Sequence, residues 1–486
     1  MNGPRLLAGW TAAALGVLGA AGCAVGPNYR APATPPSAAG AFVSTAPSSA
    51  QTTAAPADWW RLYDDPVLDR LVREALLEND DLKVAQANLA DAQALVSQAR
   101  AGLFPTTDVS AGATYGRSAT ADSLASLTNT KAQASWFYST GFSAAYQIDL
   151  FGQIRRSIQA AQANAEAQQA AENAVRVTVA AETAAAYANV CGYAEQAAVA
   201  TRSLQLVQDS YDITVRQRDA GALSDFDVAR QATLVEQARA AIPTFDGQRR
   251  AALFELTALL GKTPAQAPSD AAACQIPPRL TRPLPVGDGA ALLKRRPDVR
   301  EAERVLASDT AKIGVAVANL YPSVTLGGAI SAGAATPSQM FNYNSVSYSA
   351  GPLISWTFPN TLVALAQIRQ ARAVASGALA SFDSTVVQAL KETEQALTTY
   401  AAELDRHGSL AAARDRANEA LRLAQIQYQA GTASYLDLLT AETTVVNAEQ
   451  ALAASDQLLS SDQVEVFQAL GGGWEDAPAV TAPKAG

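Results

Sequence analysis

The sequence is poor in the residues that bind metals and carry out acid–base chemistry. Among 486 residues there is one histidine, His407, with two methionines and three cysteines. A single imidazole argues against a histidine-based metal centre and against a serine-hydrolase triad. The sequence has no glycine-rich phosphate-binding loop followed by lysine, so nothing indicates nucleotide binding. We therefore expect no metal, no cofactor and no enzymatic activity.

Basic character and aromatic side chains are also scarce. The net charge is −9 and the isoelectric point is near 4.9, which argues against a nucleic-acid partner. Aromatic residues make up 7% of the chain although 49% is hydrophobic, because alanine supplies much of the apolar count. Small side chains let helices approach closely but bury little area each. We therefore expect laterally packed helices rather than a leucine-rich bundle.

Long apolar runs are absent except at the N-terminus. Residues 6–22 carry no charge, follow Arg5 and end in small residues, which is typical of an export signal at 1–22. The ending AAGC resembles a bacterial lipobox, which implies that Cys23 is lipidated and becomes the mature N-terminus. Ala24 after the cysteine implies sorting to the outer membrane. Ordinary cleavage with an incidental Cys23 is the alternative.

The segment after Cys23 and the two remaining cysteines give further expectations. Residues 23–57 are rich in proline, alanine, serine and threonine and are expected to form an extended tether. Cys191 and Cys274 could pair in an oxidising compartment. Because Cys191 lies in an alanine-rich helical pattern, we expect buried thiols instead.

The chain is an internal duplication. The segment DAGALSDFD at 219–227 recurs as QAGTASYLD at 429–437, and the segment LFP at 103–105 recurs as LYP at 320–322. The numbering offset between copies is 210 for the first pair and 217 for the second. The slip of seven arises downstream of LFP and LYP, and insertions collect in loops. We expect a loop there, and a full structural unit in each half.

Four short segments alternate apolar and polar residues, which predicts strands. They lie at about 106–116, 140–150, 323–332 and 349–358. Each is about the ten residues that a tilted strand needs to cross a bilayer. One face is apolar in all four, and the flanking segments are helical, which leaves no strands for a second layer. We therefore favour a transmembrane barrel over a half-buried sheet of a soluble protein.

Four strands are too few to close a barrel, since roughly eight is the practical minimum. An open edge in lipid would leave backbone groups unpaired, at several kcal/mol each. Three copies of a four-stranded unit give about twelve strands, an even number compatible with known barrels. We therefore expect a homotrimer in contact with outer-membrane lipid.

Long helices connect the strands. The proline-free stretches 153–218 and 362–429 predict helices on the order of 100 Å long. Gly221 and Gly431 are expected as their left-handed C-caps. Ser224 and Ser434 are candidate N-caps of helices returning over 225–260 and 435–470. Each half thus contains a helical hairpin with a sharp tip near 221 or 431, and shorter helices at 81–102 and 298–319 lead into strands.

Several longer motifs resemble one family. They are CAVGPNYRAP at 23–32, YQIDLFGQIRRS at 146–157, RRPDVREAE at 295–303 and the duplicated hairpins. They resemble the outer membrane factors, the TolC-like ducts, and in particular the lipid-anchored OprM-like branch, over nearly all of 23–475. The resemblance implies an α+β membrane protein, a trimeric duct with a 12-stranded transmembrane β-barrel and a periplasmic α-helical barrel. It also implies docking onto a periplasmic adaptor (membrane fusion) protein and an inner-membrane transporter that supplies the energy.

The hairpin tips are expected to form the narrowest point of such a duct. The candidates for a periplasmic constriction are Asp225, Phe226, Asp227, Tyr435, Leu436 and Asp437. Ringed carboxylates would raise one another's pKa and favour cations, whereas stabilisation of a helix N-terminus is the alternative role of Asp225 and Asp227. Many members of the family carry an aspartate where this chain has Thr440, which leaves the location of an acidic ring open.

The exposed tip residues are candidate adaptor-docking points. They are Gly221, Ala222, Ser224, Gly431, Thr432 and Ser434. Simple helix capping is the alternative role, and the two roles are compatible. Bulky side chains at Gly221 and Gly431 are expected to abolish export while trimers still assemble.

The sequence thus predicts an outer-membrane exit duct that passively conducts drugs or other small molecules for a tripartite efflux pump. Type I protein secretion and metal efflux use similar ducts; a structural envelope lipoprotein and a secreted enzyme are weaker alternatives. Glu392 and Glu394 could pose as an acid pair, but they point to different sides of a helix, so a solvated face is expected. The expected division is a signal peptide at 1–22, a lipidated tether at 23–57, a first repeat at 58–262, an equatorial linker at 263–296, a second repeat at 297–472 and a flexible tail at 473–486.

Overall fold

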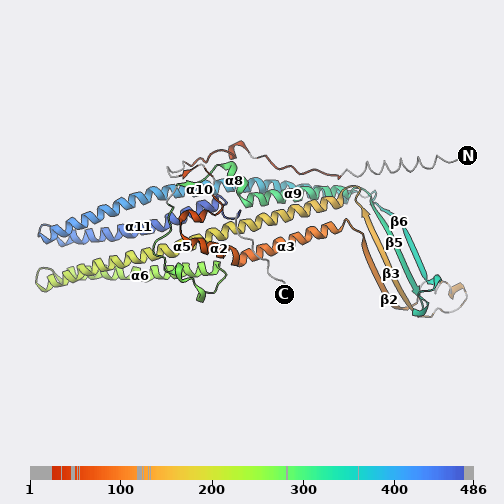
Figure 1. Cartoon of the computed structure of the whole chain (residues 1–486), viewed down its shortest axis with the longest axis horizontal. Coiled ribbons are helices and arrows are strands. Elements are labelled where there is room, and N and C mark those ends of the chain that lie inside the picture. The colour runs from red at the N-terminus through yellow and green to blue at the C-terminus, as the bar shows by residue number, and fades with distance from the viewer. Residues whose placement is uncertain are drawn as a thin grey trace. The chain divides into compact units, whose positions relative to one another are not determined.

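The computed structural model forms two compact units (Figure 1). It describes residues 24–33, 35–44, 50–51, 53, 55–117, 123, 125–127, 129, 131, 133–280, 283–359 and 361–475. The first unit comprises Met1–Ala31, Ala90–Ala167 and Glu303–Ser381, and the second comprises Pro32–Leu89, Gln168–Ala302 and Phe382–Gly486. The expected signal peptide and Cys23 lie outside the described residues.

The first unit contains a four-stranded antiparallel sheet with the order β2–β3–β5–β6 (Figure 1). The strands are β2 (Thr106–Gly116), β3 (Ser135–Ile148), β5 (Ser323–Ala334) and β6 (Val346–Ser355). Strand β3 begins five residues before the expected segment and ends before Asp149. The Asp149 carboxylate accepts the backbone N–H groups of Ile154 and Arg155 at 3.0 and 3.1 Å, so this side chain caps the helix that begins at Gln153 instead of extending the strand.

The end of β6 also differs from the expected bounds. The alternation predicts a strand to residue 358, but the ladder stops at Ser355, opposite Ser323. The aromatic residues that follow it turn to other contacts, because Trp356 donates its ring N–H to the carbonyl of Leu320 at 3.1 Å and stacks on Phe358. Alternating residue types alone do not mark where pairing ends.

The strand registers place the apolar residues on one face of the sheet, as the alternation predicts. Val109 pairs with Phe142, Phe142 with Ile330, and Ile330 with Tyr348. Serines and glycines dominate the other face, where the Ser331 and Ser347 hydroxyls lie 2.8 Å apart. The connection from β2 to β3 spans 117–134, and the shorter connection from β5 to β6 spans 335–345. Their lengths differ by seven, so the slip between the repeats lies in this loop.

The helices repeat in the same order in both halves. Helices α3 (Asp80–Ala101) and α9 (Pro297–Ala318) lead into β2 and β5. Helices α5 (Gln153–Asp219) and α10 (Leu362–Gln429) follow β3 and β6, and each continues from the first unit into the second. Helices α6 (Asp225–Leu259) and α11 (Tyr435–Ala469) return from the tips. All six lie within one residue of their expected bounds, although Pro243 stands inside α6.

The core lies in the second unit. Trp59 is fully buried and stacks on Phe467, with ring centroids 4.7 Å apart. The apolar face of α2 (Pro66–Glu78) packs into the same cluster, together with Leu256 and Leu260 from the end of α6. This cluster supplies the large side chains that the long helices lack.

The segment between the repeats contains short elements, namely η4 (Pro264–Gln266), α7 (Ser269–Ala272), β4 (Leu284–Pro285) and α8 (Gly289–Arg295). Strand β4 pairs in parallel with β1 (Ala50–Gln51). The expectation that the flanking segments are entirely helical was therefore wrong for these two short strands. A two-residue pair is below the length at which alternation can be detected.

Residues 40–44 of the expected tether are bound within the second unit. The Gly289 N–H donates to the carbonyl of Gly40 at 2.9 Å. The Glu394 carboxylate accepts the N–H groups of Val43 and Ser44 at 2.6 and 2.8 Å. The expectation of a solvated Glu392 and Glu394 face was thus wrong, because Glu392 pairs with Arg296. Each carboxylate stabilises a separate neighbouring segment.

Cys191 and Cys274 form a disulfide, so the expectation of two buried thiols was wrong. Cys191 is fully buried in α5, as its helical pattern suggests. Cys274 follows α7 in the segment between the repeats, 83 residues later, and folding brings the two together. The bond ties this segment to α5.

Within the described ranges no helix is both long and apolar enough to cross a membrane. The same part of the chain has no cluster of three or more histidine, cysteine or acidic side chains arranged to hold a metal ion.

Candidate functional site

The two hairpin tips share one backbone geometry. Gly221 and Gly431 have φ angles of +77° and +73°, the left-handed conformation that favours glycine. Around the first, the Ala222 N–H donates to the carbonyl of Gln217; around the second, the Thr432 N–H donates to that of Gln427, both at 2.9 Å. These bonds satisfy carbonyls that the helix end leaves free. A side chain at either glycine would meet no heavy atom within 4 Å, so both positions face open space.

Each return helix begins with a reciprocal capping box. The Asp227 carboxylate accepts the Ser224 N–H at 3.0 Å and the Ser224 hydroxyl at 2.7 Å. Asp437 does the same with Ser434, at 2.9 and 2.7 Å. These hydrogen bonds lower the pKa of both aspartates. Within one chain the two carboxylates therefore act as helix caps, and a ring of copies that raises their pKa stays a prediction.

The other residues expected at the constriction differ between the tips. Asp225 forms a 3.0 Å ion pair with Arg218. Phe226 and Leu436 are exposed, and the Arg230 guanidinium lies 5.6 Å from the centre of the Phe226 ring. Tyr435, in contrast, is half-buried and turns into the protein. The structure thus brings together only part of the expected set.

A buried polar network lies near the second tip, and the sequence did not predict it. The Tyr435 hydroxyl donates to the Gln231 side-chain carbonyl at 2.9 Å and lies 3.2 Å from the Thr214 hydroxyl. The Gln231 amide donates to the Val207 carbonyl at 3.2 Å, and its contact to Glu442 is 3.5 Å. Residues of α5, α6 and α11 therefore meet in one network that joins the two hairpins of a chain.

Glu442 is the charged centre of this network. Its side chain is only 1% exposed, accepts a hydrogen bond from the Ser210 hydroxyl, and burial raises its pKa. One sequence feature could have pointed to Glu442. It is a carboxylate among the apolar and threonine residues of α11, a helix without lysine or arginine. Its partners Ser210 and Gln231 are 232 and 211 residues away in sequence, so the pattern could not identify them.

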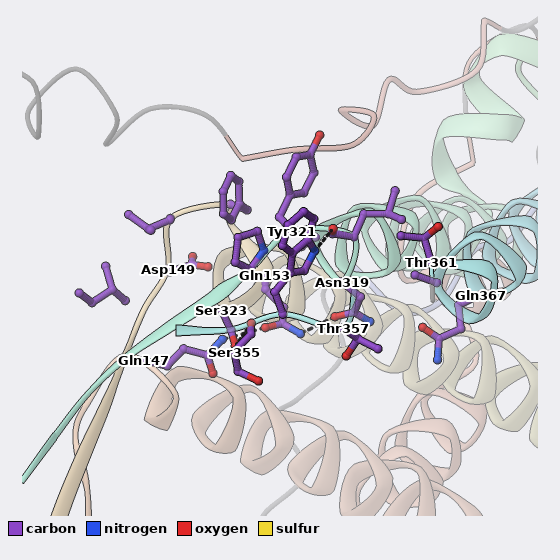
Figure 2. A pocket seen from close by; sticks show the side chains of 18 of the residues that line it. Gln147, Asp149, Gln153, Asn319, Tyr321, Ser323, Ser355, Thr357, Thr361 and Gln367 are labelled. Atoms are coloured by element: carbon purple, nitrogen blue, oxygen red, sulfur yellow. Dashed lines mark hydrogen bonds between the residues drawn. The ribbon is translucent and has the colours of Figure 1, made fainter. Parts of the chain in front are cut away.

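Where β3, β5 and β6 meet their helices, the first unit has a polar pocket (Figure 2). The Gln147 amide donates to Gln153 at 2.8 Å, and the Gln153 amide donates to Asn319 at 2.7 Å. Phe151 and Tyr321 stack beside this chain of amides, with centroids 4.5 Å apart. The pocket is polar but almost uncharged, since its one carboxylate, that of Asp149, caps α5.

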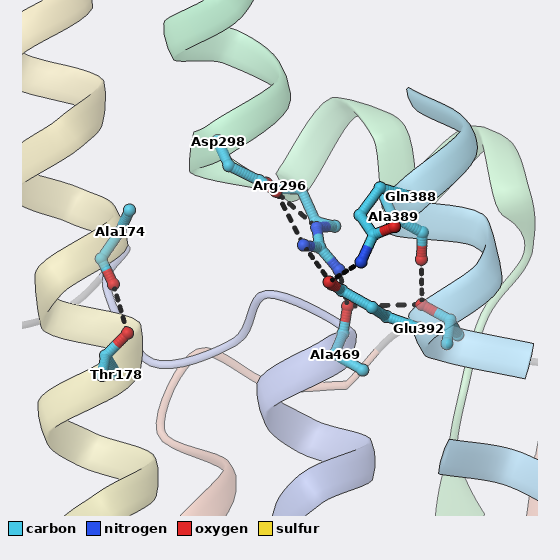
Figure 3. A network of polar contacts seen from close by, with 9 residues as sticks. Ala174, Thr178, Arg296, Asp298, Gln388, Ala389, Glu392 and Ala469 are labelled. Carbon is cyan, nitrogen blue, oxygen red and sulfur yellow. Dashed lines mark hydrogen bonds and ion pairs between the residues drawn. The ribbon is translucent and has the colours of Figure 1, made fainter. Parts of the chain in front are cut away.

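In the second unit, the RRPDVREAE motif folds around Arg296 (Figure 3). The Arg296 guanidinium contacts the carboxylates of Asp298 at 2.7 Å and Glu392 at 2.8 Å, and the carbonyl of Ala469 at 3.0 Å. It thereby joins the start of α9, the middle of α10 and the end of α11. An arginine whose side chain is 11% exposed and whose donors are satisfied stabilises the packing of these helices. These contacts account for Arg296 without a ligand.

The single histidine belongs to another polar cluster of the second unit. The His407 imidazole and the Arg279 guanidinium lie 2.6 and 2.5 Å from one Asp456 oxygen. Burial, together with the nearby Asp456 charge, raises the pKa of Glu195 to about 7. The arrangement is an ion-pair cluster between α5, α10, α11 and the segment carrying Cys274.

The fold and its duplicated tips agree with the comparisons to known proteins. The family model described as outer membrane efflux protein matches residues 71–262 and 290–472. Nodulation protein T of Rhizobium leguminosarum bv. viciae is 30% identical over 95% of this chain and 93% of its own length. The antibiotic efflux pump outer membrane protein ArpC of Pseudomonas putida is 30% identical over 93% of each chain.

The structural comparison gives the same result. The solved outer-membrane channel OprN is 34% identical, with a TM-score of 0.85 over 93% of this chain and 100% of its own. The six long helices, the four strands of the antiparallel sheet and both hairpins of this chain all fall within the ranges that the family model matches. The chain therefore belongs to the outer membrane efflux protein family, and it is an outer-membrane exit duct of an efflux pump.

Proposed function

We propose that three copies of this chain close a twelve-stranded barrel in the outer membrane, continued by a helical barrel in the periplasm. The assembly passively conducts small molecules that an inner-membrane transporter delivers through a periplasmic adaptor protein. The energy for transport comes from the transporter, and the duct carries out no chemical step.

The single observation that supports this assembly is the pair of free edges on the sheet. Strands β2 and β6 pair on one side only, and every residue in both strands is exposed. In lipid the unpaired backbone groups of each edge would cost several kcal/mol apiece. Four strands are too few to close on themselves. Pairing of β6 in one copy with β2 in the next removes every edge.

The N-terminal segment is proposed to anchor the duct through lipidated Cys23. The first residues after it are held on the first unit by Arg156, which donates to the carbonyls of Val25 and Gly26 at 3.1 and 3.3 Å and to Asn28 at 2.8 Å. This clasp supports a fixed starting point for the acyl chain beside the sheet. Residues 1–22 are then the removed signal, and we propose the same division into two repeats, linker and tail that the sequence predicts.

The tips are proposed as both gate and docking surface. Asp225, Phe226 and Leu436 are exposed beside the duplicated caps and line the proposed constriction together with Asp227, Tyr435 and Asp437. The open surroundings of Gly221 and Gly431, with Ala222, Ser224, Thr432 and Ser434 next to them, suit a shape-matched adaptor. The residues at both turns are glycines or have small side chains. We therefore expect docking to depend on these residues staying small.

Small hydrophobic drugs are the proposed cargo, since ArpC is by name part of an antibiotic efflux pump. No residue in the described ranges favours a secreted protein or a metal ion instead. Deleting the gene should lower the minimal inhibitory concentrations of several unrelated drugs by at least fourfold. A deletion strain unchanged for drugs but defective in secreting one protein would contradict this cargo.

The decisive experiment is on the purified, detergent-solubilised chain. Its mass is expected to be that of three chains, and insertion into a planar bilayer is expected to give discrete conductance steps. A monomer that inserts no channel contradicts the proposal. Palmitate labelling that is lost in Cys23→Ser tests the anchor separately.

A further inference from the structure

The polar pocket of the first unit suits an uncharged ligand (Figure 2). Its volume is about 400 Å³, within the range of about 300–1,000 Å³ that is typical of small-molecule sites. The Asp149 carboxylate is 12% exposed, pairs with Arg155 at 3.1 Å and caps α5. None of the described residues that line the pocket is a lysine or an arginine. A charged ligand would therefore find no free counter-charge here.

Three side-chain amides in the pocket form a hydrogen-bonded chain, the amide relay, with two open ends (Figure 2). Gln147 donates to Gln153 at 2.8 Å, and Gln153 donates to Asn319 at 2.7 Å. Within the described part of the chain, no protein group donates to the Gln147 side-chain carbonyl or accepts from the Asn319 side-chain amide. The relay thus offers one acceptor and one donor, and a hydroxyl group can satisfy either.

Aromatic rings lie beside the amide relay. Tyr321 stacks on Phe151, and Trp356 stacks on Phe358 with ring centroids 4.8 Å apart. The Trp356 ring N–H is already bound to the carbonyl of Leu320. Tyr321 and Trp356 both line the pocket and are 43% and 53% exposed. Exposed rings next to amides suit a ligand with an apolar face and hydroxyl groups at its edge, which describes a sugar ring.

The duplicated framework does not require the amide relay. At the repeat offsets, the counterparts of its three members are Thr357, Val363 and Gly102. The other half of the chain therefore joins its strands to its helices without any of these amides. Since the junction forms without them, the fold alone does not explain the relay, and a role in binding does.

The pocket continues the polar face of the sheet. Gln147 pairs with Thr325 on this face. Ser323 pairs with Ser355 on the same face, and both line the pocket. In the proposed barrel the apolar face meets lipid, so the polar face lines the duct. A molecule in the pocket would therefore lie on the path of the cargo.

We propose that this pocket binds the sugar ring of uncharged, glycosylated cargo inside the duct. The inference rests on the proposed function and adds a cargo class to it. The Asn319 amide donates to one ring hydroxyl, and the Gln147 carbonyl accepts from another. The exposed ring faces of Tyr321 and Trp356 contact the C–H face of the sugar. Gln153 is a positioning residue, because it orients both outer amides.

The test is a titration of the purified full-length chain in a detergent without a sugar headgroup. Glucose, glucosamine and glucuronate share one ring and differ in charge, and saturation-transfer NMR measures the binding of each. Glucose should bind at least about threefold more tightly than either charged sugar, because the pocket has no free counter-charge.

Variants test the relay and the rings separately. Asn319→Ala should raise the dissociation constant for glucose by about three- to tenfold, the loss of one hydrogen bond. Trp356→Ala should weaken binding similarly, whereas Trp356→Phe keeps a ring face and should retain most of it. Ser349→Ala, on the polar face of β6 outside the pocket, is the matched control and should change nothing.

The most specific variant changes the charge of the relay and keeps its shape. Gln153→Glu places a carboxylate at the centre of the relay and should reverse the preference, so that glucosamine binds more tightly than glucose. Misfolding would weaken the binding of both sugars and cannot produce this reversal. If the preference stays unchanged, the relay is not the sugar site.

A cellular measurement tests whether the sugar belongs to the cargo. Cells carrying Asn319→Ala should accumulate a fluorescent coumarin glucoside more than cells with the unmodified chain, and the same coumarin without glucose equally. If the variant binds glucose weakly but exports both compounds normally, the pocket binds a glycan of the cell envelope, and the cargo assignment is wrong.

The outcomes separate this inference from the proposed function. The same preparation is measured for native mass and for conductance in a planar bilayer. If it forms conducting trimers that bind no glucose, the inference fails alone. If it is monomeric and inserts no channel, the proposed function fails, and the cargo assignment fails with it even where glucose binds.

Discussion

The two hairpin tips have the same backbone and different side-chain contacts. Both have a left-handed glycine, a capping serine and an aspartate that completes the cap. The ends of the flanking helices differ. At the first tip the facing positions hold the ion pair of Arg218 and Asp225. Their counterparts at the second tip are Tyr428 and Tyr435, whose rings lie 6.2 Å apart. Duplication has kept the turn and replaced the contact across it.

The residues behind the tips differ even more. Ser210, Thr214 and Gln231 of the first hairpin hold Tyr435 and Glu442 of the second. The counterparts of these three polar residues are alanines, Ala420, Ala424 and Ala441, and the counterpart of Glu442 is Ala232. The polar connection between hairpins is therefore built once per chain. In the proposed trimer, the equivalent contact between copies would have four alanines and Asp225 in place of this network, so we expect the hairpins of one chain to be tied more firmly than those of neighbouring chains.

The largest expected effect concerns what the two tips share. Gly221→Asn and Gly431→Asn keep a residue that tolerates the left-handed turn but add a side chain to the open surface. If both tips dock the adaptor, each variant loses drug export, while the trimer yield in detergent stays normal. Gly408→Ala, at an exposed helical glycine, is the matched control and should export normally. If both Asn variants still export drugs, the two glycines act only as helix caps and not as docking points.

The next effect concerns the network that only the second tip has. Glu442→Leu leaves the Ser210 hydroxyl without its acceptor in a buried site, and it leaves the Gln231 amide with the Val207 carbonyl alone. We expect the unfolding free energy to fall by about 1–3 kcal/mol, measured by denaturant titration of the helical signal. Glu236→Leu, on the exposed face of α6, should change it by less than about 0.5 kcal/mol. Equal effects of the two would mean that the network does not tie the hairpins.

Whether a structural feature could be predicted from the sequence depends on how far apart in the sequence its interacting residues are. The four hairpin helices have their expected bounds at the tips because a left-handed glycine and a capping serine lie at each turn. The sheet faces followed from local alternation, and the extra loop length from the slip between repeats. Tyr435 was assigned to the constriction because it sits at the tip, but its partner Gln231 is 204 residues away.

The other predictions that were wrong or absent have the same cause, namely that the interacting residues are far apart in the sequence. The Cys191–Cys274 disulfide closes over 83 residues, and the helical pattern around Cys191 predicts its burial and nothing about its partner. Glu394 reads as a surface residue of α10 until the chain near Ser44 covers it. A single sequence predicts local conformation well. Contacts between side chains of distant segments can be identified only in the folded structure.

The acid–base behaviour of the tips gives a third comparison. Burial raises the pKa of Glu442, so its contribution to stability is complete below its ordinary pKa near 4.5 and is lost as pH rises through the folded value. The lowered pKa of Asp227 and Asp437 acts in the opposite sense, and only below about their ordinary value of 3.8. Above the ordinary pKa near 4.5, Glu442→Gln should therefore flatten the fall of the melting temperature with pH. Asp437→Asn should leave that slope unchanged; the same flattening in both variants would contradict the assignment.

A smaller effect is expected at the shared caps. Ser224→Ala and Ser434→Ala each remove the hydroxyl that accepts a backbone N–H of the first helical turn. Each should lower the unfolding free energy by about 1 kcal/mol, and the two losses should be equal within error, since the capping geometry is the same. The corresponding threonine variants should recover most of the loss. If the two losses of unfolding free energy differ clearly, the two caps are not energetically equivalent, although their backbone geometry is the same.

The smallest effect is expected where the first tip differs from the second. Arg218 and Asp225 are both solvent-exposed at the end of the hairpin, and exposed ion pairs contribute little because water and salt screen them. Asp225→Asn should therefore leave the unfolding midpoint unchanged at about 0.15 M and at about 1 M salt. Tyr435→Phe, at the equivalent position of the second tip, should lower it at both salt concentrations, because its hydroxyl contacts are partly buried. If Asp225→Asn destabilised the chain as much as Tyr435→Phe, the first tip would also be held by its contact, and the asymmetry between the hairpins would disappear.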